Sequence, residues 1–377
     1  MALREAGHSV CRVNFTAGDA LYWRLGNAVS FRGRLGQLPG FYERRFREWR
    51  VTDVVLFGDC RPVHRPAILV AEQLRLRVHV FEEGYFRPYR ITLERDGVNA
   101  HSPLMSILRR DAAPDFDPPR KPTAFKSPFW CRAVHDVAYH AAGMANPVLF
   151  PYYRNHARYV APLEYLGYAW RLPALRWYRK RDDRLLKSLL LRRQRFFVLP
   201  LQLDGDSQIR QHSPFANMRE LMQGVVDSFA KHAPAEAALV VKNHPLDPGL
   251  AHHGRVLRRL VERYDVKGRV FYMETGQLPR LLRQAAGVVT VNSTVGSLAL
   301  EAGLPLMVLG QALYAQPGLV HDGDLHSFWT HCMPPDMQRF RRLRQRVLAQ
   351  ATVNGGLYGS MGIALAVQNS LPRLLDA

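Results

Sequence analysis

The sequence has few cysteines, and their positions suggest no shared task. Cys11, Cys60, Cys131 and Cys332 are scattered over 377 residues, with no CxxC pair and no Cys/His ligand spacing. This pattern argues against a zinc site and against a disulfide framework. It fits a protein of the reducing cytoplasm.

Long apolar runs are missing as well. No window reaches the roughly 18 uninterrupted apolar residues that a membrane-spanning helix needs. The start at Met1 has no charged segment followed by an apolar one, so no secretory signal is indicated. These absences predict a cytoplasmic protein, peripheral to a membrane at most.

Acidic residues are scarce relative to basic ones. The chain has 32 Asp and Glu against 52 Lys and Arg, a net charge of +20, which predicts a polyanionic partner. Nucleic acid, an anionic membrane face and an acidic polymer all qualify by charge. No nucleic-acid recognition motif occurs, so nucleic acid is not expected. Basic residues alternate with aromatics and leucines in 41–50 and 172–195, a pattern that can lie at a lipid headgroup surface. The alternative is a solvated helix face with a few core contacts.

Strand and helix patterns alternate along both halves of the chain. The first half predicts strands at 9–15, 53–57 and 78–81 and a helix at 65–76. The second half predicts strands at 196–201, 238–242, 270–273, 287–291 and 306–308, separated by helices at 217–232, 254–264, 278–285 and 295–302. This rhythm predicts an α/β fold with two Rossmann-like domains that face a central cleft, as in GT-B glycosyltransferases.

The predicted domains are an N-terminal acceptor-side domain at 1–185 and a C-terminal nucleotide-sugar-binding domain at 186–340. Helices at 341–377 are expected to pack back across both. A basic linker is expected near 180–195, and 112–175 reads as an irregular segment. Because Met1 falls inside a helical pattern leading to Gly7, we expect either that the first strand of the N-terminal domain is missing or that the true start lies upstream.

The segment Lys242-Asn243-His244-Pro245 follows a predicted strand. Side chains at the carboxyl end of such a strand face the ligand in open α/β sheets. Pro245 stiffens the turn, while Lys242 and His244 can donate to a phosphate that gains charge as it leaves. The alternative is a histidine that only closes a loop hydrogen bond.

A strand also gives way to hydroxyl residues at Ser293 and Thr294. Either residue can cap the helix that follows, and the N-terminus of a helix binds anions through its backbone N–H groups. The pattern predicts a second phosphate contact, with an ordinary helix cap as the alternative.

Two aspartates, Asp204 and Asp206, follow the strand at 196–201. A DxD pair can bind a divalent metal and a diphosphate in sugar transferases. The sequence after Asp206 contains a full set of alternating strands and helices with its own predicted phosphate site, which a metal-dependent transferase with a single domain would not need. This favours one aspartate as a direct participant in substitution at carbon. An Asp-Gly turn is the structural alternative, and it suits Asp204 better than Asp206.

Glu82 and Glu83 end the strand at 78–81, just before Gly84. Adjacent side chains on an extended strand point to opposite sides, so only one can readily face a substrate. Glu83 is predicted to be the general acid/base, and Glu82 to orient a neighbour.

With these motifs in place, the chain resembles the capsule polysaccharide biosynthesis/export family, in particular its KpsS/LipB-type members. The resemblance runs through the segments 14–23, 57–61, 81–88, 199–208, 242–245 and 291–296. The acidic pair and the His-Pro dipeptide are also similar to bacterial sialyltransferases that use CMP-linked donors. Family members usually have an initial strand and loop before the segment at 4–10, and the resemblance leads us to expect that this segment is missing here.

The resemblance implies a retaining β-Kdo glycosyltransferase, which moves 3-deoxy-manno-octulosonic acid (Kdo) from CMP-β-Kdo to phosphatidylglycerol or its lyso form. That acceptor starts the capsular polysaccharide linker. The implied partners are the CMP-sugar donor, an anionic phospholipid, the inner face of the cytoplasmic membrane and other capsule synthesis and export proteins. No metal or other cofactor is expected, because a basic site can stabilise the single phosphate of a CMP leaving group.

Carried over by motif position, the resemblance makes Asp206 the nucleophile and Glu83 the acid/base. Lys242 and His244 contact the CMP phosphate, and Gln202 supports the loop or the donor. The phosphate site is completed by Asn292, Ser293 and Thr294.

Two other functions stay open on the sequence. One is a metal-dependent nucleotide-diphosphate-sugar transferase that uses Asp204 and Asp206. The other is a non-enzymatic capsule export or assembly factor that binds anionic polysaccharide through the charge of +20.

Overall fold

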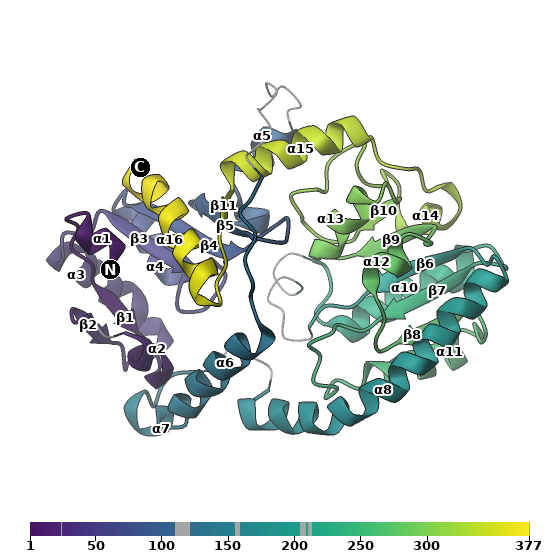
Figure 1. Cartoon of the computed structure of the whole chain (residues 1–377), viewed down its shortest axis with the longest axis horizontal. Helices are drawn as coiled ribbons and strands as arrows, with labels where there is room; N and C mark the ends of the chain where they lie inside the picture. The colour runs from purple at the N-terminus through teal and green to yellow at the C-terminus, as the bar shows by residue number, and fades with distance from the viewer. Residues whose placement is uncertain (24, 110–120, 155–158, 204–208, 210–212, 377) are drawn as a thin grey trace. The chain divides into compact units, whose positions relative to one another are not determined.

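The structure, a computed structural model, describes the chain except for residues 24, 110–120, 155–158, 204–208, 210–212 and 377. The chain divides into two compact units. The first unit contains residues 1–104, 114–156 and 345–377, and the second contains 105–113 and 157–344. Each unit is built around its own β-sheet (Figure 1).

A four-stranded sheet in the order β11-β5-β4-β3 organises the first unit. Strands β3 (Asp53–Phe57) and β4 (Arg77–Glu83) are parallel, with helix α4 (Arg65–Gln73) between them in the chain. The predicted strand-helix-strand unit is therefore confirmed. Strand β5 (Arg90–Arg95) runs antiparallel to β4, and β11 (Thr352–Asn354) runs antiparallel to β5. This sheet is mixed, whereas the Rossmann-like domain predicted for this half of the chain has a mostly parallel sheet.

Apolar side chains from α3 (Leu38–Glu48) and α4 form the main core of the first unit, together with Val78 and Val80 of β4. A smaller core joins β5, β11 and α16 (Ser360–Leu375) around Ile91 and Val353. The remaining elements of this unit are α1 (Ala2–Glu5), β1 (Arg12–Asn14), α2 (Ala17–Tyr22), β2 (Ala28–Ser30), the 3₁₀ turns Leu35–Gln37 and Asn99–His101, α6 (Phe129–Gly143) and α7 (Asn146–Leu149). Strands β1 and β2 pair in a separate two-stranded parallel sheet.

Five parallel strands form the sheet of the second unit, in the order β10-β9-β6-β7-β8. They are β6 (Phe196–Pro200), β7 (Ala238–Lys242), β8 (Val270–Met273), β9 (Gly287–Thr290) and β10 (Leu306–Val308), close to the predicted ranges. Every residue of β6 and β7 is buried, as parallel strands covered on both faces require. The strand order reverses between β6 and β9, which is where open α/β sheets bind ligands.

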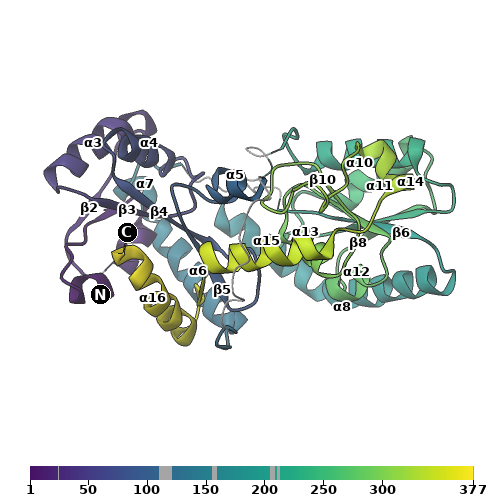
Figure 2. The ribbon, with the colours of Figure 1, turned by 90° about the horizontal axis from the view of Figure 1, so that it is seen from above.

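Helices cover both faces of this second sheet (Figure 2). One face carries α10 (Met218–His232), α11 (His253–Arg263) and α14 (Leu325–His331), whose apolar side chains pack on Phe197 and Val241. The other face carries α8 (Ala161–Leu191) and α12 (Leu278–Leu282). The remaining helices are α5 (Leu104–Arg109), α13 (Thr294–Glu301) and α15 (Met337–Gln350).

The compact units divide the chain differently from the predicted domains. The boundary expected at 185/186 lies inside α8, and the expected basic linker at 180–195 is the end of this helix and the turn into β6. The C-terminal residues 345–377 belong to the first unit, because β11 pairs with β5 and α16 packs beside it. Within the described part of the chain, no helix combines the length and the apolar character needed to cross a bilayer.

Candidate functional site

The carboxyl ends of β9, β6 and β7 bring three of the predicted site segments side by side in the second unit. Gln202 follows β6, Lys242 ends β7 and Asn292 follows β9. Gln202 Nε2 donates a hydrogen bond of 3.1 Å to Asn292 Oδ1, which joins the loops after β6 and β9. These loops meet at the position where the strand order reverses, so the residues stand where a ligand of this sheet type binds.

Lys242 is a buried cation, with only 5% of the residue exposed. Burial lowers the pKa of Lys242 to about 8, against the opposing effects of Asp182 and Glu274. Its Nζ donates to the backbone oxygen of Asn243 at 3.0 Å. Because this low pKa lies near neutral pH, a small change in its surroundings can convert the Lys242 ammonium to the neutral amine.

His244 is half-buried on the loop after β7, and Pro245 beside it is exposed. His244 Nδ1 accepts a hydrogen bond of 3.1 Å from the backbone N–H of Leu246. A neutral ring with Nδ1 as acceptor carries its hydrogen on Nε2. The loop therefore favours the tautomer with the hydrogen on Nε2. This N–H can donate a hydrogen bond to a phosphate oxygen.

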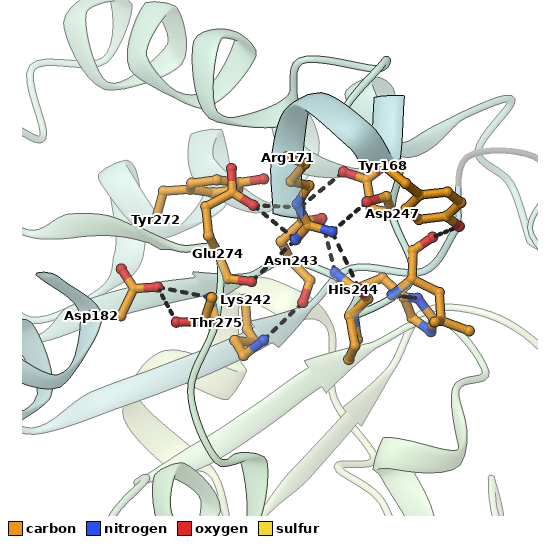
Figure 3. Close-up of polar contacts among 12 residues, drawn as sticks. Tyr168, Arg171, Asp182, Lys242, Asn243, His244, Asp247, Tyr272, Glu274 and Thr275 are labelled. Carbon is orange, nitrogen blue, oxygen red and sulfur yellow. Dashed lines mark hydrogen bonds and ion pairs between the residues drawn. The ribbon is translucent and has the colours of Figure 1, made fainter. Parts of the chain in front are cut away.

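Arg171 of α8 holds the loop after β7, which carries His244, in place (Figure 3). Its Nη1 donates to the backbone oxygens of Pro245, at 3.2 Å, and of Asp247. Its Nη2 donates to the Glu274 carboxylate at 3.1 Å. Both charged side chains are largely buried, so the ion pair is shielded from water and holds the loop against α8.

Asn243 completes this network with every polar atom of its side chain. Nδ2 donates to Asp247 Oδ2 and to Glu274 Oε2, each at 2.9 Å, and Oδ1 accepts from the backbone N–H of His244 at 2.8 Å. A buried side chain with all its hydrogen bonds formed has one favoured position. The backbone at His244 is thereby held in place.

The sequence did not single out Arg171, Asn243, Asp247 or Glu274 for this role. Asn243 and Asp247 lie on the motif loop, so their nearness to His244 could have marked them. Arg171 and Glu274 stand 72 and 31 residues from Asn243 in sequence (243 − 171 and 274 − 243), with no local pattern that links them.

Helix α13 begins directly after the loop that follows β9, and Ser293 is its N-cap. Ser293 Oγ accepts from the backbone N–H of Val295 at 3.2 Å, and its backbone oxygen accepts from the Tyr314 hydroxyl at 2.6 Å. The Ser293 hydroxyl therefore stabilises the helix start, as the alternative reading of this segment expected. Thr294, the first residue of the helix, is exposed and its hydroxyl can face a ligand.

The predicted nucleophile Asp206 and its neighbour Asp204 lie outside the described residues. Their roles stay predictions from the sequence.

Glu82 and Glu83 lie in the first unit, at the end of β4. Glu83 forms ion pairs with Arg87 and, at 3.9 Å, with Arg132. Burial raises the pKa of Glu82, while its hydrogen bond from the Glu83 N–H and the nearby Arg61 lower it. Burial outweighs these two effects, and the pKa of Glu82 lies above its ordinary value.

A second buried carboxylate, Glu94, lies on β5 beside this strand end. It accepts hydrogen bonds from the Tyr85 hydroxyl, at 2.6 Å, and from the Ser102 hydroxyl. Burial raises the pKa of Glu94 to about 7, against the effect of these two donors. No sequence pattern indicated Glu94, because β5 itself was not predicted.

One group among the described residues has the composition of a metal site. Potential ligand atoms of Asp59, Cys60 and His101 lie within 4.8 Å of one another. Asp59 Oδ2 already bonds to His101 Nδ1 at 3.0 Å and to the Val98 N–H at 3.1 Å. Burial, with a smaller effect from Asp59, raises the pKa of the Cys60 thiol to about 12. Because the Asp59 carboxylate already bonds to both His101 and the Val98 N–H, these residues fit a hydrogen-bonded cluster within the first unit.

Comparison with protein families identifies the chain. The model of a family described as capsule polysaccharide biosynthesis protein matches residues 52–358. The chain belongs to this family. The matched segment runs from β3 to beyond β11, and it includes the loops after β4, β6, β7 and β9.

Individual relatives cover almost the whole chain. The capsule polysaccharide modification protein LipB of Neisseria meningitidis serogroup B is 34% identical over 95% of this chain and 88% of its own length. The capsule polysaccharide export protein KpsS of Escherichia coli is 35% identical over 94% of this chain and 92% of its own length. The predicted family resemblance is therefore confirmed.

A solved structure described as KpsC, beta Kdo 2,7 transferase, from Thermosulfurimonas dismutans is 16% identical to the chain. The match covers 98% of this chain and 100% of that one, with a TM-score of 0.47.

Proposed function

We propose that this family member is a retaining glycosyltransferase that moves Kdo from CMP-β-Kdo to phosphatidylglycerol or lysophosphatidylglycerol. The product is the start of the linker that carries a capsular polysaccharide. Family membership supports the capsule role. The observation that carries the proposal is the meeting of the loops after β6, β7 and β9, at the reversal point of a parallel sheet.

In this proposal the second unit binds the donor. The Nε2–H of His244 and the ammonium of Lys242 stabilise the phosphate of CMP as it leaves. The start of α13, with Ser293 and Thr294, supplies backbone N–H groups to the same phosphate. Gln202 and Asn292, already bonded to each other, hold the loops after β6 and β9 around the sugar.

Retention of configuration takes two displacements in this scheme. A carboxylate of Asp206 attacks the anomeric carbon of Kdo, and the bond from that carbon to the phosphate oxygen breaks as CMP leaves. The acceptor hydroxyl then attacks the same carbon and releases Asp206. Glu83 takes the proton of that hydroxyl, and Glu82 orients the strand end through its bond to the Glu83 N–H.

The proposed chemistry requires no metal. The leaving group has one phosphate, and the donors around it are a lysine, a histidine and a helix N-terminus. Turnover in EDTA equal to turnover in buffer is the expected result. Loss of turnover that added Mg²⁺ or Mn²⁺ restores would instead support the metal-dependent transferase that uses Asp204 and Asp206.

The proposed acceptor is an anionic lipid, and we place the enzyme on the inner face of the cytoplasmic membrane with other capsule synthesis and export proteins. The net charge of +20 supports an anionic surface as partner.

The direct test incubates the full chain with CMP-Kdo generated in place and a fluorescent phosphatidylglycerol analogue, and follows the product by mass spectrometry. We expect addition of one Kdo, with turnover reduced at least a hundredfold in His244→Ala. The matched control is His8→Ala, at an exposed histidine of the first unit, which should leave turnover unchanged. A folded wild-type protein that adds no mass to the acceptor would refute the proposed function. In cells, capsule-lipid synthesis that persists with a folded Asp206→Ala variant would favour the export or assembly factor.

A further inference from the structure

Helix α8 has two faces of opposite character. It spans 31 residues, all of them described, and its inner face buries Gly167, Arg171 and Leu186 against the rest of the second unit. A side chain at Gly167 would place its Cβ 2.6 Å from the backbone oxygen of Pro248, so the helix lies directly against the loop that follows His244. This contact fixes which side of α8 faces outward.

The outward face carries large apolar side chains along its first half. Leu163 is 42% exposed, Leu166 67%, Trp170 88% and Trp177 59%. The spacings of three, four and seven residues place these four on one side of a helix. Surface tryptophans and leucines scattered singly are ordinary, whereas a continuous stripe marks an interaction site.

Basic residues continue the same face along its second half. Lys180, Arg184 and Lys187 are exposed at spacings of four and three, in line with Trp177, and Arg176 is exposed beside Lys180. Helix α8 has three acidic residues, Glu164, Asp182 and Asp183, and none is at an exposed position. The exposed charges of this face are therefore all positive, and Asp183, which lies next to them, is half-buried.

We infer that this outward face of α8, from Leu163 to Lys187, binds the surface of an anionic phospholipid membrane. Tryptophan and leucine enter the headgroup and upper acyl region, while lysine and arginine bind lipid phosphates. Charge complementarity selects this occupant, because four exposed cations without an exposed anion suit a surface of negative charge. The choice of membrane over other anionic surfaces rests on the lipid acceptor in the proposed function.

The inference also gives α8 a link to the donor loop. Arg171 on the inner face bonds to the backbone of Pro245 and Asp247, next to His244. Trp170, the adjacent residue, is the most exposed apolar residue of the stripe. Docking through Trp170 would hold the His244 loop at a set height above the lipid headgroups.

The test is flotation of the full chain with vesicles of phosphatidylcholine alone or mixed with phosphatidylglycerol, without donor and at two salt concentrations. We expect binding to the mixed vesicles that weakens in high salt. The double variant Leu166→Ala/Trp170→Ala should bind them at least tenfold more weakly, and Lys180→Glu/Arg184→Glu should lose most of the preference for phosphatidylglycerol. The control Met333→Ala removes an equally exposed apolar side chain elsewhere in the second unit and should bind as the wild type does.

Three outcomes would overturn the inference: no binding of the wild type, equal binding of the Leu166/Trp170 variant, or equal binding to both vesicle types at both salts. A dimer that becomes a monomer in the Leu166/Trp170 variant would overturn it in favour of a second copy as occupant. Turnover of a water-soluble short-chain phosphatidylglycerol should be unchanged in that variant. Because vesicle binding needs no turnover, failure of the inference and failure of the proposed function give different results.

Discussion

Removal of the Arg171 guanidinium should destabilise the second unit and release the His244 loop. The perturbation is Arg171→Met, which keeps much of the length and apolar volume of the side chain and deletes its charge. The substitution leaves the Glu274 carboxylate without its cation, and the backbone oxygens of Pro245 and Asp247 without their donor.

The size of the effect follows from burial. Only 9% of the Arg171 side chain and 18% of the Glu274 side chain are exposed, so water can replace few of the lost bonds. Removal of one partner from a buried ion pair costs about 3–5 kcal/mol. For a unit of this size, each kcal/mol lowers Tm by about 2–4 °C, so a fall of roughly 6–20 °C is expected.

The assay is thermal and urea unfolding followed by circular dichroism, with Arg184→Met as the matched control. Arg184 is an exposed arginine of the same helix and donates only to the backbone oxygen of Lys180, one turn earlier, at 3.3 Å. Its loss should cost less than about 0.5 kcal/mol. A double-mutant cycle of Arg171→Met with Glu274→Gln should give a coupling energy of about 1–3 kcal/mol.

The reasoning is refuted if Arg171→Met unfolds within about 1 kcal/mol of the wild type, or if the cycle gives no coupling. Arg171→Lys is a second check. It keeps the charge but cannot place two nitrogens on separate acceptors, so it should recover only part of the lost stability.

Two further predictions concern the first unit. Burial raises the pKa of Glu94 to about 7 from its ordinary 4.5, so the native protein binds more protons between these values and its stability falls as pH rises from 4.5 through 7. The change in the free energy of unfolding amounts to about 3 kcal/mol, and Glu94→Gln should remove it. Urea unfolding between pH 5 and 8 measures this change. A wild-type free energy of unfolding that stays constant over that range would contradict the prediction. In Gly84→Ala, the new Cβ would lie 2.2 Å from the Arg90 backbone oxygen, so a loss of about 1–3 kcal/mol is expected in thermal unfolding. Gly40→Ala in α3, where the Cβ meets open space, should be neutral or stabilising; similar Tm changes in both variants would count against the steric argument.

Local patterns predicted most of the second unit because its strands are buried on both faces. Strands β7, β8 and β10 have the predicted ranges, and β6 and β9 each end one residue before theirs. Continuous apolar runs bounded by turns are readable without knowledge of the neighbours. Strand β5 was missed because Arg90–Arg95 contains charged residues and because its partner β11 is distant in sequence: Thr352 pairs with Thr92, 260 residues earlier (352 − 92).

The motif loops were located by sequence because they follow readable strands. Lys242, His244, Ser293 and Gln202 all stand at the carboxyl ends of strands in the second sheet, as predicted. The roles assigned to them stay predictions. The sequence could not reveal that the Ser293 hydroxyl caps α13, because serine and threonine are common both at helix caps and at ligand sites.

The sequence by itself determined the α/β class, the strands of the second sheet, the family and the positions of the motif loops. These depend on hydrophobic periodicity and short motifs, which are local properties of the chain. Only the tertiary structure decided that Arg171 and Glu274 hold the His244 loop, that Glu94 is a buried acid with a raised pKa, and that α8 turns an apolar and basic face outward. Each of these depends on which surfaces are buried against distant parts of the chain, and burial sets both the strength of an ion pair and the pKa of a carboxylate.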